Sequence, residues 1–164
     1  MADWDDLLSE YLHVPEQLEA ALQGLSEVQL NLCPRPEEWS IRQIVHHIVD
    51  GDDLWALILK QALGEAPQEL NLQWYWEYPQ ENWGSWWAYA QREIAPSLAL
   101  LRASREHITQ LLRQVPNAQE RSIGVCWPNG EREQISVPDI IEMQTSHISG
   151  HSQEIRAIRE QHGI

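Results

Sequence analysis

Apolar residues recur at helical spacing along almost the whole chain, and this periodicity limits the possible fold more than any other feature of the sequence. No regular alternation of strand and helix patterns indicates an α/β sheet. Four substantial helices in a chain of this length predict an all-α four-helix bundle. The expected helical segments are Asp3 to Leu12 followed by Pro15 to Leu22, then Ser40 to Leu63, Glu81 to Val115 and Pro138 to Gln161.

Proline and glycine residues interrupt the helical pattern. Pro96 falls inside the third predicted helix, where it either kinks one helix or begins a new one. The connection from Glu65 to Pro79 is long and rich in aromatic residues. The segment from Arg121 to Val137 contains the turn sequence Pro128-Asn129-Gly130, so we expect a small hairpin or an irregular loop before the last helix.

Length and charge bound the class of protein. The chain has 164 residues, so we expect a single domain over residues 1–164. With 11 Lys plus Arg against 25 Asp plus Glu, the formal charge is −14, which argues against nucleic acid and against an anionic membrane surface as partners. An acidic N-terminus, two cysteines in no paired motif and the lack of a long apolar run lead us to expect a cytoplasmic location.

The second predicted helix carries two adjacent histidines. At the rotation of an α-helix, its isoleucines and Trp55 gather on one face, which must meet the bundle core. This wheel places His46 about opposite to that face, toward solvent, and Arg42 on the helix exterior. His47 lies on the flank of the apolar face, so we expect His47 to point inward.

The last predicted helix has a polar run in the middle of its apolar face. His147 and His151 lie there one turn apart, and Gln144 and Glu154 share the face. Such polar groups are costly in a core unless they are satisfied. Two imidazoles at positions i and i+4 suit the binding of one metal ion, and His47 supplies a third. The sequence therefore predicts a metal site of three histidines, and the alternative is a structural bundle with hydrogen-bonded buried histidines.

Three neutral imidazoles favour a borderline divalent ion, namely Zn, Ni or Fe, with Co also compatible. Three protein ligands leave at least one coordination position for water or substrate. Glu154 is the one candidate catalytic residue, because a carboxylate there can orient an imidazole or accept a proton; the alternative is a solvated or salt-bridged side chain. Asp50, one turn after His47, is either a hydrogen-bond acceptor for the site or a surface residue.

Tryptophan is unusually common, with nine residues against no phenylalanine. Trp83, Trp86 and Trp87 have the spacing of one helical face, and Trp74 and Trp76 precede them. Three interpretations remain open: core packing in place of phenylalanine, a wall of the metal pocket, or a dimer interface.

Three segments resemble the DinB/YfiT-like superfamily. WSIRQIVHHIVD, from Trp39 to Asp50, is similar to the signature of its second helix, and HISGHSQEI, from His147 to Ile155, is similar to that of its last helix. The stretch from Ser97 to Leu112 is similar to the third helix. The resemblance covers most of the chain in the right order. It implies an up-down-down-up four-helix bundle in which His47, His147 and His151 hold a divalent metal ion.

The same resemblance implies a range of functions. Some members resemble metal-dependent hydrolases, and others are S-transferases that use bacillithiol, mycothiol or similar low-molecular-weight thiols. Members often form homodimers. We therefore expect a homodimeric metal-dependent hydrolase or thiol S-transferase that acts on a small molecule. The alternative is a non-catalytic protein that binds a metal or a small ligand. No glycine-rich phosphate loop or lysine motif predicts an organic cofactor.

Overall fold

The protein is described by a computed structural model that covers residues 3–64 and 69–164. Of the long aromatic connection, residues 65–68 therefore lie outside the described part. The helices and strands follow one another as α1 (Trp4–His13), α2 (Pro15–Leu22), the short 3-10 helix η1 (Gln29–Asn31), α3 (Ile41–Ala62), β1 (Glu69–Asn71), α4 (Gln73–Trp76), α5 (Gln80–Trp86), α6 (Ile94–Gln114), η2 (Ala118–Glu120), β2 (Ser122–Cys126), β3 (Arg132–Ser136) and α7 (Val137–Gln161).

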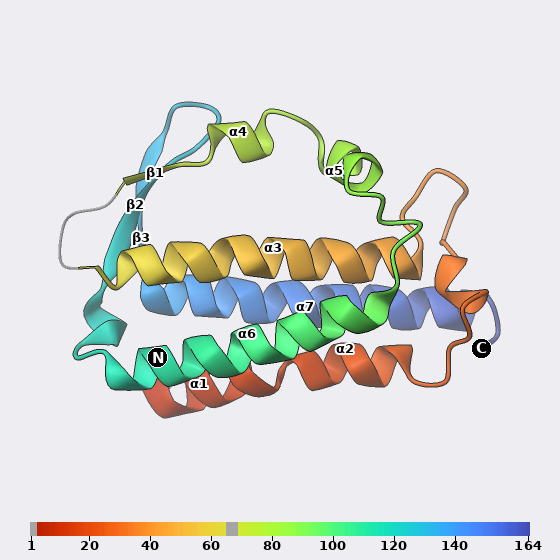
Figure 1. Cartoon of the computed structure of the whole chain (residues 1–164), viewed down its shortest axis with the longest axis horizontal. Coiled ribbons are helices and arrows are strands. Elements are labelled where there is room, and N and C mark those ends of the chain that lie inside the picture. Colours follow the sequence, from red (N-terminus) through yellow and green to blue (C-terminus); the bar gives the residue numbers. More distant parts are fainter. Residues whose placement is uncertain (1–2, 65–68) are drawn as a thin grey trace.

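The long helices form the predicted four-helix bundle (Figure 1). Helices α1 and α2 follow each other along one side of the bundle and together act as its first helix, with Pro15 at the start of α2. In Figure 1, α1, α2 and α7 run in one direction, whereas α3 and α6 run in the other. The order is therefore up-down-down-up, as expected.

The two helices that carry the histidines of interest begin at well-formed caps. The Ser40 hydroxyl accepts a hydrogen bond from the Gln43 amide, and the Gln43 side chain accepts one from the Ser40 amide. Ser136 and Asp139 form the same reciprocal capping box at the start of α7. Each box satisfies backbone donors that a helix N-terminus leaves free, so the starting residues of α3 and α7 are well defined.

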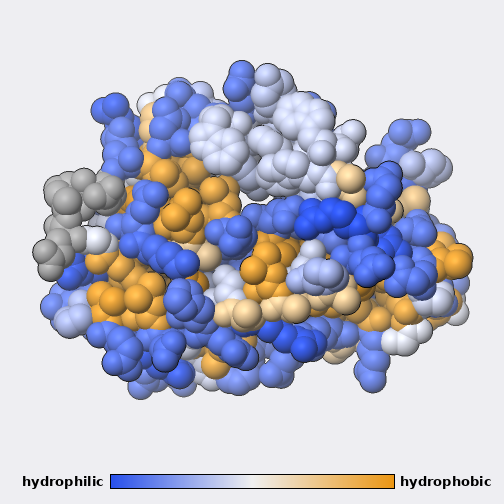
Figure 2. Space-filling view, in the orientation of Figure 1, coloured by the Kyte–Doolittle hydropathy of each residue, from blue (hydrophilic) through white to orange (hydrophobic). Residues whose placement is uncertain are grey.

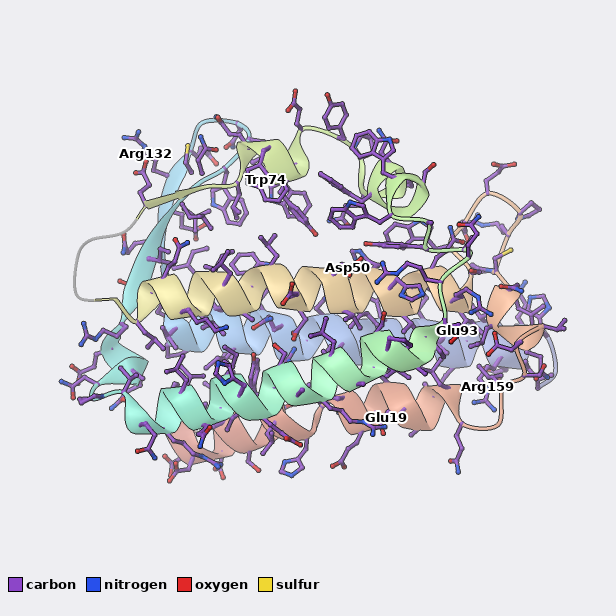
Figure 3. All side chains as sticks on the ribbon, in the orientation of Figure 1. Glu19, Asp50, Trp74, Glu93, Arg132 and Arg159 are labelled. Atoms are coloured by element: carbon purple, nitrogen blue, oxygen red, sulfur yellow. The ribbon has the colours of Figure 1, made fainter. Side chains whose placement is uncertain are left out.

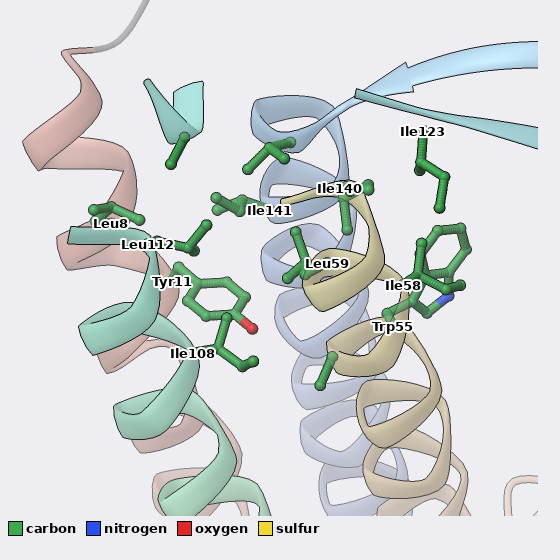
Figure 4. Close-up of a cluster of buried hydrophobic side chains, with 14 of the residues drawn as sticks. Leu8, Tyr11, Trp55, Ile58, Leu59, Ile108, Leu112, Ile123, Ile140 and Ile141 are labelled. Carbon is green, nitrogen blue, oxygen red and sulfur yellow. The ribbon is translucent and has the colours of Figure 1, made fainter. Parts of the chain in front are cut away.

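The apolar core lies between the four bundle helices (Figure 4). Tyr11 from α1, Leu59 from α3, Ile108 from α6 and Ile140 from α7 are all buried within one cluster. A second cluster fills the other half of the bundle, around Ile48. No helix in the described part of the chain combines the length and the apolar character that a membrane crossing requires.

A buried ion pair crosses the centre of the bundle. Arg105 on α6 is 0% exposed, and its Nη2 donates to Asp52 Oδ1 on α3 over 2.5 Å. Arg105 Nη1 also donates to the carbonyl of Tyr11 on α1 at 3.2 Å. Gln144 Nε2 on α7 donates to the same Asp52 oxygen at 2.8 Å. The Asp52 carboxylate and the Arg105 guanidinium thus link all four helices of the bundle.

A small sheet closes one end of the bundle. Strands β2 and β3 pair antiparallel around the Pro128-Asn129-Gly130 turn, so the hairpin alternative is confirmed. Strand β1 adds to β2 in parallel, which gives the order β1-β2-β3. The sequence did not predict β1, because a strand of three residues has no measurable alternation.

The expectation of one helical span from Glu81 to Val115 is wrong. Helix α5 ends at Trp86, and α6 begins at Ile94. Ala88 adopts a left-handed backbone with φ of 54°, which an α-helix cannot accommodate. Pro96 lies in the first turn of α6, where its missing amide costs no helical hydrogen bond, so of the two alternatives Pro96 belongs to the start of a new helix.

We expect Arg105→Met to lower the free energy of unfolding by about 3–5 kcal/mol, because it leaves the Asp52 carboxylate buried without its charge partner. Urea denaturation followed by circular dichroism measures the change. The matched control is Arg102→Met on the same helix, since Arg102 pairs with Glu19 at the surface and its loss should cost far less. Equal losses in both variants would contradict the structural role of the buried pair.

Candidate metal centre

The structure brings His47 of α3 together with His147 and His151 of α7. One ring nitrogen from each of the three lies within 4.8 Å of the others. The closest pair is His47 Nε2 and His147 Nε2, which are 3.1 Å apart. The ring centroids lie 4.6–5.0 Å from one another. The three residues that sequence spacing grouped are therefore neighbours in space.

Helical geometry explains why these three imidazoles converge. His147 and His151 are one turn apart on the face of α7 whose isoleucines Ile148 and Ile155 are buried. Helix α3 packs antiparallel to α7 and buries His47 between Ile44 and Ile48. The apolar neighbours fix the rotation of each helix, and that rotation turns the histidines toward one another.

Burial keeps the two innermost imidazoles neutral. Burial, reinforced by the neighbouring His147 and His151, lowers the pKa of His47 to about 3. Burial, followed by the nearby His151 and Arg105, lowers the pKa of His147 to about 4. Both rings are therefore unprotonated near pH 7, and each has a lone pair free for a metal ion.

The donor set fits a divalent ion. At a Zn–N distance of about 2.0–2.1 Å, two nitrogens in tetrahedral geometry lie about 3.3 Å apart. The observed 3.1 Å between the Nε2 atoms of His47 and His147 is close to that separation. An all-imidazole set suits Zn, Ni or Fe better than Mg or Ca, which prefer oxygen ligands. His47, His147 and His151 are thus compatible with binding one divalent ion.

Glu154 supports the centre from outside. Its Oε2 lies 2.7 Å from His151 Nδ1. A carboxylate only accepts, so Nδ1 of His151 carries the proton and Nε2 keeps its lone pair. Glu154 is exposed and touches the site through His151, which corresponds to the predicted orienting role. This contact with His151 does not place the Glu154 carboxylate where it could exchange a proton with a substrate.

Asp50 forms an ion pair away from the three histidines. Its Oδ2 forms an ion pair with Arg92 Nη1 over 3.1 Å, and both side chains are partly buried. Arg92 lies in the segment that leads from α5 into α6. Asp50 is therefore neither a partner of the three histidines nor a free surface carboxylate.

Two expectations from the helical wheel are wrong. His46 is 0% exposed rather than solvent-facing; its Nε2–H donates to the Arg92 carbonyl at 3.2 Å and its Nδ1 accepts from the Ser97 hydroxyl at 2.9 Å. Arg42 is 6% exposed, and its guanidinium binds Glu27, Asn31 and the same Arg92 carbonyl. The wheel failed because other segments cover the polar side of α3. Ser97 and the Arg92 carbonyl cover His46, and Glu27 and Asn31 near η1 help to cover Arg42.

The aromatic residues of α4 and α5 form a roof over α3 rather than core packing. Figure 2 shows a pale, aromatic-rich surface over this segment, and Figure 3 places Trp74 there, above α3. Trp86 is 54% exposed, which rules out the core interpretation. Trp83 stacks on Tyr75 at 5.9 Å and donates its Nε1–H to the Tyr75 carbonyl. Ahead of α3, the Trp39 ring lies 4.6 Å from the His47 ring.

A pocket of about 160 Å³ opens beside the histidines, between α3, α7 and the roof. Trp76 lines it, whereas Trp83, Trp86 and Trp87 do not, so the pocket-wall interpretation holds for only part of the tryptophan cluster. The lining residues are His47, Gly51, Asp52, Trp55, Tyr75, Trp76, Gln80, Trp127, Met143, Gln144 and His147. Sequence reasoning missed Tyr75 and Gly51, because nothing in their local pattern shows that two distant segments meet there.

Comparison with known proteins agrees with this arrangement. Residues 10–155 match the family model described as the DinB superfamily. A protein of Geobacillus thermodenitrificans described as "Putative metal-dependent hydrolase" is 25% identical over 161 residues, which cover 98% of this chain and 86% of the relative. YfiT of Bacillus subtilis, described in the same words, is 25% identical over 160 residues, which cover 98% of this chain and 84% of YfiT.

A solved structure shares the fold. YfiT from Bacillus subtilis superposes with a TM-score of 0.82 at 24% identity, covering 97% of this chain and 87% of YfiT. That structure is described as having "an unusual four-helix bundle topology". The likeness confirms that the bundle and its connections belong to one known architecture.

We expect the native chain to bind about one divalent ion, and His47→Ala, His147→Ala and His151→Ala each to lose most of it. Elemental analysis of untagged protein after reconstitution with Zn, Ni or Fe(II) measures the content. His107→Ala, an exposed histidine on α6, is the matched control and should keep the metal. A native chain that takes up no metal would contradict the centre.

We expect Glu154→Ala to weaken metal affinity about tenfold, because His151 loses the acceptor that fixes its tautomer. Competition with a metal chelator measures the dissociation constant. Glu160→Ala removes an exposed carboxylate from the same helix and serves as the control. A matching loss in the control would mean that overall charge, rather than the contact with His151, sets the affinity.

Proposed function

The chain belongs to the DinB superfamily, and we propose that it is a metal-dependent hydrolase of a small molecule. The observation that carries this proposal is the convergence of three imidazoles at the edge of a pocket. The names of its relatives as metal-dependent hydrolases support the same reaction class.

His47, His147 and His151 would hold the ion. A divalent ion in such a site acts as a Lewis acid that polarises a carbonyl and lowers the pKa of water. Three protein ligands are fewer than the four of a closed structural site, which is the pattern of a catalytic site. His47 and His147 line the pocket, so a substrate bound there lies next to two of the three ligands.

The remaining residues position and shield the reaction. Glu154 fixes the tautomer and orientation of His151 and is a positioning residue. Trp76 and Trp127 line the pocket, where their rings would limit the access of bulk water to a bound substrate. Asp52 also lines the pocket, but its charge is committed to Arg105, so we assign no proton transfer to it.

Hydrolysis is favoured over thiol transfer by the absence of a cationic group where an anionic thiol would need one. Among the described residues that line the pocket, none is Lys or Arg. Arg42, a nearby cation on α3, is buried and bound to Glu27 and Asn31. A thiol that carries carboxylates would therefore meet no Lys or Arg counter-charge among these residues, and only a bound metal ion would offset its charge.

We expect the metal-loaded protein to hydrolyse members of a panel of uncharged aryl esters and amides, and the chelator-treated protein to lose that activity about a thousandfold or more. Steady-state kinetics before and after reconstitution with Zn, Ni or Fe(II) measures the effect. His151→Ala should be inactive, whereas His107→Ala should keep the native rate. A chain that binds metal but turns over no substrate in the panel would contradict catalysis and favour a non-catalytic ligand-binding protein.

A further inference from the structure

The pocket beside the histidines has the size of a single aromatic ring. Its volume is about 160 Å³. An engineered apolar cavity of about 150 Å³ in another protein binds benzene, so a six-membered ring fits a space of this size. Four of the eleven lining residues are Trp or Tyr, namely Trp55, Tyr75, Trp76 and Trp127, with Met143 beside them. Flat aromatic walls favour a flat apolar occupant.

Gly51 keeps this space open. It lies in the middle of α3, where glycine weakens a helix relative to alanine. A Cβ at this position would lie 3.9 Å from His147 Cε1 and 4.0 Å from the Tyr75 hydroxyl oxygen. These are ordinary contact distances, so alanine would fit without displacing either neighbour. Glycine instead leaves a methyl-sized gap between a metal-binding imidazole and a hydroxyl group.

The side-chain charges around the pocket offer nothing to attract an anion. The described lining residues include no Lys or Arg, and the one carboxylate, that of Asp52, is paired with Arg105. The Tyr75 hydroxyl is the polar group that faces the gap over Gly51. Burial raises the pKa of Tyr75, so its hydroxyl stays protonated near pH 7 and can donate a hydrogen bond.

We propose that this pocket binds an uncharged aromatic group of the substrate, and that the Tyr75 hydroxyl donates a hydrogen bond to a carbonyl oxygen attached to that group. Gly51 is then the residue that sets the size limit. That the bound group belongs to a substrate rests on the proposed hydrolytic function. Binding of the aromatic carbonyl group itself is a separate property, and it can be measured without turnover.

The test uses three probes of similar size with the zinc-loaded and the metal-stripped protein. Acetophenone has an aromatic ring and a carbonyl, ethylbenzene lacks the carbonyl, and benzoate carries a charge. We expect calorimetric or ligand-detected NMR titration to show acetophenone binding about three- to tenfold more tightly than ethylbenzene, as one hydrogen bond predicts. In the metal-stripped protein benzoate should bind more weakly than both, because no Lys or Arg among the described lining residues offsets its charge. Acetophenone should bind with or without zinc.

Single substitutions locate the binding. Gly51→Ala should weaken acetophenone binding about tenfold. The thermal unfolding midpoint of this variant should equal or exceed that of the native protein. Gly150→Ala is the matched control, because the added Cβ on α7 meets nothing within 4 Å. Tyr75→Phe should abolish the preference for acetophenone over ethylbenzene. Zinc content, measured in parallel, should be the same in all variants.

Several results would overturn the inference. Equal binding of acetophenone and ethylbenzene, tighter binding of benzoate to the metal-stripped protein, or indifference to Gly51→Ala would each contradict it. Acetophenone binding that requires zinc would also contradict it, since the probe would then be bound to the ion. If the chain hydrolyses esters but binds no ring-sized probe, the inference fails and the proposed function stands. If acetophenone binds as expected but nothing is hydrolysed, the proposed function fails and the ligand site stands.

Discussion

The ion pair between Asp52 and Arg105 is the contact on which the arrangement of the bundle depends. A charge buried this deeply must be matched by its partner, so the four helices cannot slide past one another without breaking the match. The consequence reaches the metal centre directly. Asp52 follows His47 by little more than a turn on α3, and Gln144 precedes His147 by about a turn on α7. Because Gln144 donates to Asp52, the register that satisfies the ion pair also brings His47 beside His147.

The long helices hold the three histidines, whereas the aromatic segment with α4 and α5 covers the pocket beside them. Long, capped helices hold the three histidines, where small displacements would spoil a ligand set. The segment with α4 and α5 supplies Tyr75, Trp76 and Gln80 to the pocket wall. Tryptophan and tyrosine rings packed on one another hold this segment together. Trp83, for example, both stacks on Tyr75 and donates to its carbonyl. A short segment with little regular backbone pairing thus gains rigidity from large, stiff side chains.

The sequence allowed prediction of what depends on local periodicity. The four-helix bundle and the grouping of His147 with His151 follow from helical spacing alone, and the family resemblance added the topology. His46 was misplaced because a wheel treats one helix in isolation, and its partners Ser97 and the Arg92 carbonyl come from a segment far along the chain. The pocket was missed for a related reason. Tyr75 and Gly51 meet only after the aromatic segment folds back over α3, and no spacing rule encodes that approach.

Trp39 gives the centre an optical property. Its indole lies 4.6 Å from the imidazole of His47, which is close enough for the excited state of one ring to respond to the electronic state of the other. A cation bound at His47 would withdraw electron density from its ring and would therefore change the fluorescence of Trp39. Binding of an ion by the three histidines would then appear as a change in the intrinsic emission of a chain with nine tryptophans, without an added label.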